Sequence, residues 1–365
     1  MLLSTDLQRG GFPLRLARLA LALPVHGVTP IVGCLAPRGP LNDELEAAGI
    51  ETFAADARGA ADVRCLARLA RIVRRINPDI LHAGLFHANL AARLVGRLDR
   101  PRPIITSTAT IEIERHWHRW LESMTAGLSH WHLANSDSVA AHVIDDLGFD
   151  SARVVMIPNG LDLAAIDRAG RADRAEFGIP ADRPLIAWAG RMDPIKDLPT
   201  FVDTIAMLRA VVPAHAVLIG DGPERPRIAA RVAELGLTGV VHFAGWRQNV
   251  VEWLKSADAL LFPSRTEGCP NVVLEAMAAG CPVVASDIAP CRDLIASGVS
   301  GLLCPPGNPT AFAQGLERLL ADAELRHRIS ATASNRAHYD FNIQQIVGLI
   351  VRRYQIALGL RSDAR

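Results

Sequence analysis

Residues 259–280 read ALLFPSRTEGCPNVVLEAMAAG, and this stretch decides the fold. A short apolar run at 259–263 is followed by a turn rich in Gly, Pro and Asn. A helical pattern then begins near Asn271 and ends at Gly280. Apolar runs of this length are typical of strands in a parallel sheet that is covered on both faces. A strand, a loop and a helix in this order predict a ligand site at the carboxyl edge of such a sheet.

Strand-like and helical patterns alternate along nearly the whole chain. Short apolar runs predict strands at 29–35, 79–82, 103–107, 131–135 and 154–157, and then at 185–190, 216–220, 240–244, 259–263 and 282–286. Helical stretches such as 14–23, 63–75 and 272–279 lie between them. Half of the 365 residues are hydrophobic, which is enough for two buried cores. The alternation predicts an α/β protein with two doubly wound, Rossmann-like domains.

A turn at residues 158–160, Pro-Asn-Gly, separates the two halves, because Pro and Asn-Gly end strands. We therefore assign residues 1–163 to an N-terminal domain and residues 164–340 to a C-terminal domain. The last segment, 341–365, contains a helical pattern that could pack on either domain. Met1 leads almost directly into a turn, so either the first strand is short or the true start lies upstream.

Composition argues against several classes of protein. The 39 basic and 38 acidic residues give a net charge of +1, without the basic excess expected of a general nucleic-acid binder. The six cysteines form no CxxC pair, which predicts reduced, buried thiols in a cytoplasmic protein and no zinc site. No apolar stretch is as long as a membrane span and the N-terminus lacks a signal pattern, although peripheral contact with a membrane stays open.

Two glutamates flank the start of the helix in the quoted stretch. Backbone N–H groups around Asn271 and Val272 would face a phosphate, because the first N–H groups of a helix have no partner within it. Glu267, in the loop, can reach sugar hydroxyls, and Glu275, in the first turns of the helix, can accept hydrogen bonds from a ribose diol. The alternative is that both are surface acids near a helix start, where acids are favoured in any case.

A second stretch, residues 189–197, reads AGRMDPIKD and also follows a predicted strand. Arg191 and Lys196 bracket a turn after Gly190. Two cations there can hold a diphosphate and stabilise the negative charge that develops as it departs. Lys196 is one of only two lysines in the chain, the other being Lys255. This rarity weakens the alternative of two solvated side chains in a loop.

Two glycine-containing turns follow other predicted strands. Gly10 and Gly11 precede the first helix, where a backbone without Cβ atoms can approach a phosphate, although a plain turn explains them equally well. Residues 220–223 read GDGP and predict a tight turn at the same edge of the C-terminal sheet. Gly220 would line a ligand cleft at that edge.

These motifs resemble those of the retaining glycosyltransferases of family 4, which have the GT-B fold of two Rossmann-like domains facing across a cleft. The glycine, arginine and lysine of 190–196, the turn at 220–223 and the E-x7-E pair Glu267 and Glu275 occur in the family's order. The likeness covers essentially the whole C-terminal domain. It is looser in the N-terminal domain, at 9–11, 78–82, 135–136 and 157–162.

The resemblance implies an enzyme that transfers a hexosyl group from a UDP- or GDP-linked sugar, with retention of configuration. The acceptor would be a glycan or a lipid-linked molecule, in cell-surface polysaccharide or glycoconjugate synthesis. Glu275 would hold the ribose and Glu267 the hexose, while Arg191 and Lys196 would neutralise the diphosphate. No metal would be needed, because the two cations take its place.

The resemblance also implies roles for parts that lie further from the reacting atoms. Gly11 would pass close to the phosphates from the N-terminal domain. The base would lie near Arg247, and the last helix would cross back to the N-terminal domain.

The N-terminal domain departs from the family at several positions. Many members carry a His in the loop after the strand at 104–107, where this chain reads Thr-Ala-Thr. His116 and His118 come later, in a helical pattern. Cys269 stands where a bulkier apolar residue is common, and Phe12 follows the glycines instead of the frequent Ala. Two alternatives follow, a non-catalytic sugar-nucleotide-binding or scaffold protein and another GT-B enzyme such as a sugar-nucleotide epimerase.

Several aromatic residues and histidines in the N-terminal domain are candidates for other contacts. His82 ends a predicted strand and His87 lies in the loop that follows it, and either side chain could touch an acceptor. His130 and His132 share a strand face, but without acidic or Cys partners they predict no metal site. Four large side chains either form an exposed acceptor or membrane patch or, as we favour, pack in the core: Trp117, Trp120, Met124 and Trp131.

Overall fold

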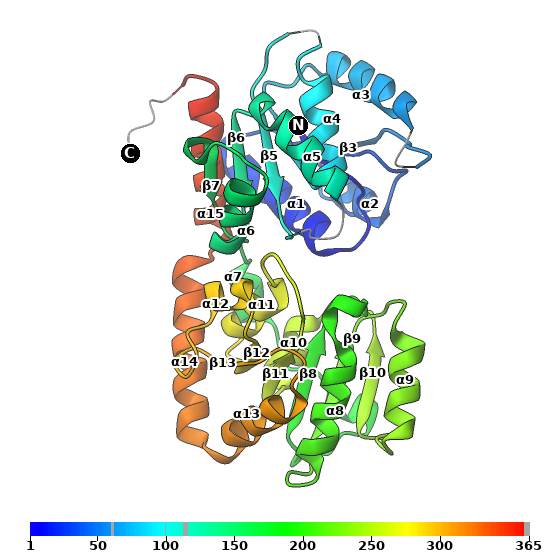
Figure 1. Ribbon diagram of the computed structural model, residues 1–365, viewed down its shortest axis with the longest axis vertical. Helices are drawn as coiled ribbons and strands as arrows, with labels where there is room; N and C mark the ends of the chain where they lie inside the picture. The colour runs from blue at the N-terminus through cyan, green and yellow to red at the C-terminus, as the bar shows by residue number, and fades with distance from the viewer. Residues whose placement is uncertain (60–61, 99, 112–115, 361–365) are drawn as a thin grey trace. The chain divides into compact units, whose positions relative to one another are not determined.

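The chain folds into two compact units, seen here in a computed structural model that describes residues 1–59, 62–98, 100–111 and 116–360 (Figure 1). The N-terminal unit comprises Met1–Gly160 and Ile343–Arg365, and the C-terminal unit comprises Leu161–Asn342. The first crossing between the units lies at the Pro-Asn-Gly turn, three residues before the end of the N-terminal domain assigned from sequence. Residues 361–365 of the predicted last segment lie outside the described residues.

The N-terminal unit is built on a seven-stranded parallel sheet with the order β3-β2-β1-β4-β5-β6-β7. The strands are β1 (Leu2–Ser4), β2 (Ile31–Cys34), β3 (Glu51–Ala54), β4 (Leu81–Gly84), β5 (Ile104–Thr108), β6 (Trp131–Ala134) and β7 (Val154–Met156). The register pairs Leu2 with Val32 on one side and with His82 on the other. The strand order therefore reverses between β1 and β4, and a crevice forms beyond the carboxyl ends of two such strands.

Helices cover both faces of this sheet, and three clusters of buried apolar residues fill the space beneath them. The helices are α1 (Gly11–Ala22), α2 (Pro40–Ala47), α3 (Val63–Ile76), α4 (Phe86–Val95), α5 (His116–Thr125), α6 (Asp137–Ala141) and α15 (Ile343–Ala357). α3 and α4 cover one face, and α1 and α15 pack together on the other. Local sequence explains some helix starts, since the side chains of Asp62 and Ser136 cap α3 and α6.

The C-terminal unit is built on a six-stranded parallel sheet with the order β10-β9-β8-β11-β12-β13. The strands are β8 (Leu185–Ala189), β9 (His215–Ile219), β10 (Val241–Gly245), β11 (Ala259–Phe262), β12 (Val283–Ser286) and β13 (Leu302–Cys304). The order reverses between β8 and β11. The two stretches quoted from the sequence follow these two strands, so the sheet brings them to one point at its carboxyl edge.

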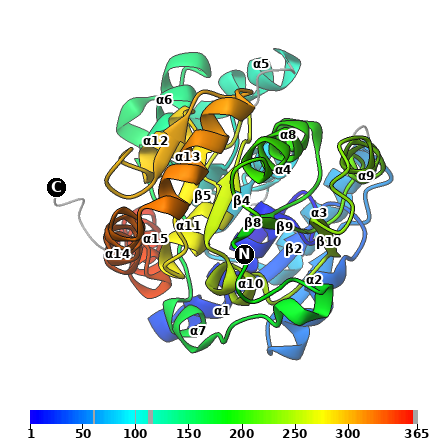
Figure 2. The same ribbon diagram turned by 90° about the horizontal axis from the view of Figure 1, so that it is seen from below.

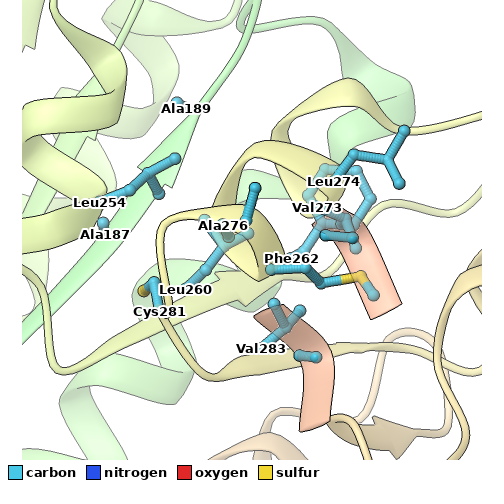
Figure 3. Packing of buried hydrophobic residues seen from close by; sticks show 14 of the residues in the cluster. Ala187, Ala189, Leu254, Leu260, Phe262, Val273, Leu274, Ala276, Cys281 and Val283 are labelled. Atoms are coloured by element: carbon cyan, nitrogen blue, oxygen red, sulfur yellow. The ribbon is translucent and has the colours of Figure 1, made fainter. Parts of the chain in front are cut away.

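The core of the C-terminal unit lies on both sides of this sheet. The helices are α7 (Leu163–Arg168), α8 (Leu198–Arg209), α9 (Arg225–Glu234), α10 (Val250–Ser256), α11 (Asn271–Ala278), α12 (Ala289–Leu294), α13 (Pro309–Ala321) and α14 (Ala323–Asp340). α8 packs against α13 on one face (Figures 1 and 2), and α11 packs against α14 on the other. Beneath α11, Leu260 and Phe262 of β11 meet Val273 and Ala276 (Figure 3). This packing holds the loop between β11 and α11 in place.

The predicted fold class is confirmed, since each of the ten predicted strands overlaps an observed strand of a doubly wound sheet. β3 and β13 are additional strands, and β1 is the short first strand. The core packing predicted for three large side chains is wrong: Trp117, Trp120 and Met124 of α5 are 53%, 62% and 64% exposed. They follow one another at helical spacing on the outward face of α5. Trp131 is partly buried against the core, under the guanidinium of Arg353.

All six cysteines lie among the described residues, are buried, and form no disulfide. Burial raises the pKa of the Cys34 thiol to about 12, so this sulfur stays protonated and unreactive. Among the described residues, no helix is both long enough and apolar enough to cross a bilayer.

Candidate functional site

The candidate site lies at the carboxyl edge of the C-terminal sheet, where four loops meet. The loop after β8 carries Gly190, Arg191 and Lys196, and the loop after β11 carries Glu267. Gly220 directly follows β9, and Arg247 follows β10. Asn271, Val272 and Glu275 belong to α11. Because β8 and β11 are neighbours at the reversal of strand order, their loops border the crevice in which open α/β sheets bind ligands.

Lys196 and Glu267 form the central contact of the site. Lys196 Nζ donates a hydrogen bond to Glu267 Oε1 at 2.5 Å, and the side chains are 18% and 11% exposed. The ammonium also lies 5.8 Å from the centre of the Phe262 ring. A charge-assisted hydrogen bond that is this well shielded from water is strong and directional. The structure therefore brings together two side chains that lie 71 positions apart in sequence.

Asp197 and Arg265 join the same two loops beside this contact. Asp197 is 5% exposed, has a left-handed backbone with φ of 48°, and accepts a hydrogen bond from Thr200 Oγ1 at 2.9 Å. Its Oδ2 pairs with an Arg265 guanidinium nitrogen at 2.9 Å, and Arg265 N donates to Ile195 O at 2.8 Å. These contacts fix where Lys196 stands. Neither residue was predicted as part of the site, although their position beside the two motif charges is a signal that could have identified them.

Gly190 and Gly220 are needed for packing between loops. Their φ angles are 155° and 129°, which L residues rarely adopt, and a Cβ on Gly220 would overlap Gly190 O. Gly190 N donates to Ile219 O at 3.0 Å, and Gly220 N donates to Gly245 O at 2.7 Å. The tight turn predicted at 220–223 lies two residues later, where Arg225 N donates to Gly222 O at 3.1 Å, and backbone packing accounts for Gly220.

Asp221 stabilises the same turn. Its Oδ1 accepts a hydrogen bond from Gly222 N at 2.8 Å, and its Oδ2 pairs with Arg225 at 2.6 Å. The backbone hydrogen bond from Gly222 first, and then the bond from Arg225, hold the pKa of this carboxyl below its usual value.

Arg191 and Arg247 are not part of the contact between Lys196 and Glu267. The Arg191 side chain is 71% exposed, and its Nε lies 3.3 Å from Asp193 Oδ2. Arg247 Nε donates to Ala244 O at 3.0 Å, and its guanidinium pairs with Glu176 and covers the Phe177 ring at 5.6 Å. Both arginines therefore have a carboxylate partner, but the Arg191 side chain is far more exposed than that of Arg247, which is 31% exposed, so its ion pair is screened by water and costs little to exchange for a ligand.

α11 directs its first turn toward the same edge. The preceding residue, Pro270, makes no side-chain cap, and the first turn contains no acidic residue. Val273, Leu274 and Ala276 point into the core (Figure 3). The partly buried residues Val272, Glu275 and Ala279, spaced three and four apart, therefore share the outer face of the helix. A helix start without a side-chain cap is suited to an anion.

Two buried hydroxyls lie at the carboxyl ends of neighbouring strands. Ser264 follows β11 and Ser286 ends β12, and both side chains are 0% exposed. Within the described part of the chain, neither hydroxyl oxygen has a hydrogen-bond partner. A buried polar group without a partner carries a free-energy cost, so both hydroxyls are suited to a polar ligand or an ordered water.

Gly10 and Gly11 lie at the corresponding point of the N-terminal unit, after β1. Gly10 is the residue before α1, with an extended backbone, and Gly11 is the first residue of the helix. A Cβ on Gly10 would meet only Pro13 Cδ, at 3.7 Å, so packing within the unit does not require glycine here. Phe12, which departs from the family, is buried against Gly84, where a Cβ would overlap its ring.

His82 is not available to an acceptor, which corrects the expectation from sequence. Its side chain is 4% exposed, and its Nδ1 lies 2.6 Å from the hydroxyl of Tyr354 on α15. Burial, with a smaller contribution from Arg15, lowers the pKa of His82 to about 3. The imidazole is therefore neutral and structural. It attaches the last helix to the N-terminal sheet.

A different imidazole contacts the end of β5, directly before the loop that lacks the family's His. His132 Nε2 lies 3.0 Å from Thr108 Oγ1, and its Nδ1 lies 2.8 Å from Thr106 Oγ1. Burial lowers the pKa of His132 well below its usual value. His116 and His118 lie two residues apart on α5 and differ in environment, the first being exposed and the second buried. Within the described ranges, no group of three or more His, Cys, Asp or Glu side chains is arranged to hold a metal.

Comparison with known sequences assigns the two halves of the chain to two family models, which end and begin close to the boundary between the units. Residues 9–165 match the family described as Glycosyltransferase Family 4, and residues 183–322 match the family described as Glycosyl transferases group 1. Over 220 residues the chain is 32% identical to the D-inositol 3-phosphate glycosyltransferase of Jonesia denitrificans, covering 56% of this chain and 52% of that protein. It is 31% identical over 198 residues to the lipopolysaccharide core biosynthesis glycosyltransferase LpsE of Rhizobium meliloti, covering 54% and 56%. The matches span about half the length of these relatives.

Solved structures share the fold along nearly the whole chain. HepE of Anabaena, crystallised with UDP, superposes with a TM-score of 0.84 at 21% identity and covers 97% of this chain and 99% of its own. A glycosyltransferase from Rickettsia africae superposes with a TM-score of 0.85 at 18% identity, covering 98% of both chains. At these identities the likeness establishes the fold of two Rossmann-like units.

Proposed function

The chain belongs to family 4 of the glycosyltransferases and has the GT-B fold, and we propose that it transfers a hexosyl group from a UDP- or GDP-linked sugar to an acceptor hydroxyl. The observation that carries the proposal is the shielded contact between Lys196 and Glu267 at the reversal of strand order. It presents a cation for a diphosphate and a carboxylate for sugar hydroxyls at one point.

In this proposal the donor replaces an internal contact with a ligand contact. A diphosphate oxygen accepts the hydrogen bond of Lys196 in place of Glu267, and the released carboxylate accepts hydrogen bonds from the hexose. Arg191, which is mostly exposed, turns toward the second phosphate. The first N–H groups of α11, at Asn271 and Val272, contribute donors, and Glu275 on the outer face of α11 accepts from the ribose.

The proposed reaction retains the configuration of the anomeric carbon. The bond from that carbon to the diphosphate oxygen breaks, the acceptor oxygen bonds to the carbon on the same face, and the acceptor proton passes to the departing diphosphate. Negative charge grows on the diphosphate as the bond breaks. Lys196 and Arg191 stabilise this charge, so the proposal includes no resident metal.

The acceptor we propose is a glycan or a lipid-linked molecule of cell-surface polysaccharide or glycoconjugate synthesis. HepE has been crystallised with UDP-glucose, and LpsE acts in lipopolysaccharide core synthesis, which supports this class of reaction. We place the protein in the cytoplasm, with peripheral contact at a membrane. Six cysteines without a disulfide fit a reducing compartment.

One observation favours a second candidate, a sugar-nucleotide-binding scaffold. Thr108 ends β5, directly before the loop that lacks the family's His, and this threonine is hydrogen-bonded to buried His132. A thermal-shift panel of UDP- and GDP-sugars tests donor binding, because a ligand that binds only the folded state raises the melting temperature. Hydrolysis or transfer of the donor that binds separates the enzyme from the scaffold. A panel without any shift contradicts both candidates.

The site assignment is tested by calorimetry with the donor that the panel identifies. Lys196→Ala and Glu275→Ala should each weaken binding, since each removes a charge-assisted hydrogen bond worth roughly 1.5–3 kcal/mol. Unchanged affinity in both variants would refute the assignment.

A further inference from the structure

Three helices, α3, α4 and α5, cover one face of the N-terminal sheet and present a surface with two parts. α3 packs against α4, and α4 packs against α5 (Figure 1). Buried residues of α3 and α4 contact the sheet through one apolar cluster. The outward residues of α3 include four arginines, and those of α5 include three large apolar side chains.

The basic part consists of Arg64, Arg71, Arg74 and Arg75 on α3. All four are exposed. None of the four side chains has a carboxylate partner in the described part of the chain, whereas Arg68 of the same helix pairs with Asp62. The helix itself, VRCLARLARIVRRI, contains no acidic residue. Cations grouped on one helix without neutralising partners create a local positive potential.

The apolar part consists of Trp117, Trp120 and Met124 on α5, together with Leu94 and Leu98 at the end of α4. They are between 43% and 64% exposed. Exposed tryptophans at helical spacing are uncommon on a surface that faces only water, and they mark contact sites. The indole combines a large apolar body with a polar N–H group, which suits the boundary between water and lipid.

Contacts beneath α5 hold this apolar part in place. The Trp117 ring lies 5.4 Å from the ring of Phe86 on α4 and 4.0 Å from that of His118. The only acidic residue of α5, Glu122, is turned inward, where it pairs with buried Arg93. The outward surface of α3, α4 and α5 therefore carries arginines and large apolar side chains and no carboxylate.

We propose that α3, α4 and α5 dock on the surface of an anionic lipid bilayer. The arginines of α3 contact lipid phosphates, and Trp117, Trp120 and Met124 enter the interfacial layer. A bilayer fits both parts, because it presents negative charge and apolar depth side by side. A nucleic acid would use the arginines and leave the apolar part exposed. The biological role of this docking rests on the proposed function, since docking would bring the enzyme to a lipid-linked acceptor.

Vesicle sedimentation with the full chain tests the docking surface. We expect binding to vesicles of phosphatidylcholine with phosphatidylglycerol, little binding to phosphatidylcholine alone, and release as salt rises. Replacing Arg71, Arg74 and Arg75 by Gln should lower partitioning on the order of 100-fold, since each arginine near a membrane contributes roughly a factor of five. Trp117→Ser with Trp120→Ser should also lower partitioning, because both apolar bodies are lost.

Matched variants on the C-terminal unit control for total charge and apolar exposure. Arg209, Arg318 and Arg328 are exposed on helices of that unit, and their replacement by Gln should leave partitioning unchanged. Tyr339→Ser removes an aromatic side chain that is 82% exposed and should likewise have no effect.

Three outcomes would overturn the proposal. They are equal binding to neutral and anionic vesicles, a triple arginine variant that partitions like its control, or a dimer in solution that the tryptophan variant dissociates. Nucleotide affinity of the same variants, measured by calorimetry, should match that of the unchanged chain. A chain that binds vesicles but no nucleotide sugar contradicts the proposed function and leaves the docking surface intact. A chain that binds nucleotide sugar but no vesicles contradicts the docking surface and leaves the proposed function intact.

Discussion

Replacing Glu267 by Gln is expected to strengthen binding of the free nucleoside diphosphate and to weaken binding of the intact donor sugar. The carboxylate of Glu267 accepts a hydrogen bond from the ammonium that the diphosphate needs, since Glu267 Oε1 lies 2.5 Å from Lys196 Nζ. The glutamine keeps the shape of the side chain but removes the competing negative charge. It also removes the charge that strengthens hydrogen bonds from the hexose hydroxyls.

The size of the effect follows from this contact. A phosphate oxygen that accepts from the same ammonium would lie roughly 5 Å from the carboxylate, given two hydrogen bonds of ordinary length. Two like charges at that separation repel by about 3 kcal/mol at an effective dielectric constant of 20 and by about 1 kcal/mol in water. The side chains are 18% and 11% exposed. We therefore expect the diphosphate to bind roughly 5- to 100-fold more tightly to the variant.

Calorimetry with UDP or GDP, and then with the corresponding sugar, measures both effects. Lys196→Met serves as the opposite case and should weaken the binding of both ligands by roughly 10- to 100-fold. Glu234→Gln is the control, because this glutamate pairs with Arg231 on α9 and belongs to none of the loops of the site. Urea denaturation of each variant verifies that the fold is intact.

The result that refutes this reasoning is a folded Glu267→Gln variant whose diphosphate affinity is unchanged or lower. Glu267 would then position Lys196 for the ligand instead of competing with it. Weaker binding of the diphosphate in both Glu267→Gln and Lys196→Met would identify the pair as a unit that binds only when joined.

Three further predictions concern stability. Gly220→Ala should lower the free energy of unfolding by about 2–4 kcal/mol in urea denaturation, because φ is 129° and the new Cβ would overlap Gly190 O; a loss under about 0.5 kcal/mol would contradict that packing. Glu122→Ala should lower the free energy of unfolding by roughly 3–5 kcal/mol, since it leaves the charge of Arg93, whose side chain is 0% exposed, without its partner. An unchanged free energy of unfolding would mean that the pair is not formed. Because the pKa of His82 is about 3 in the folded chain and 6.5 ordinarily, the unfolded chain binds a proton in this window that the folded chain does not. The contribution of neutral His82 to the free energy of unfolding should be fully present above pH 6.5. As the pH falls from 6.5 toward 3, the free energy of unfolding should decrease by up to about 1.4 kcal/mol per pH unit, and His82→Gln should reduce that slope.

Several features of the fold and site were readable from local sequence. Alternating apolar runs and helical patterns predict two parallel sheets, because side chains in a fully covered strand are apolar whatever their partners are. The motif spacing also places Lys196 and Glu267 at strand ends. The fold fixes the neighbours of a strand end, so this inference needs no knowledge of side-chain contacts. The strand β3 was missed because Glu51–Ala54 is half exposed and carries no continuous apolar run.

Tertiary structure decided what the motif side chains touch. Local sequence patterns were enough to predict two Rossmann-like units and a candidate donor edge on the second. Only the fold showed that Lys196 is held by Glu267, that Arg247 is held by Glu176, and that His82 is buried against Tyr354. It also turned Trp117 and its neighbours outward, against the packing expected from composition. The reason is physical. Strand and helix patterns arise from interactions within a few residues, whereas ion pairs and exposure depend on residues that are distant in sequence and meet only after the sheets assemble.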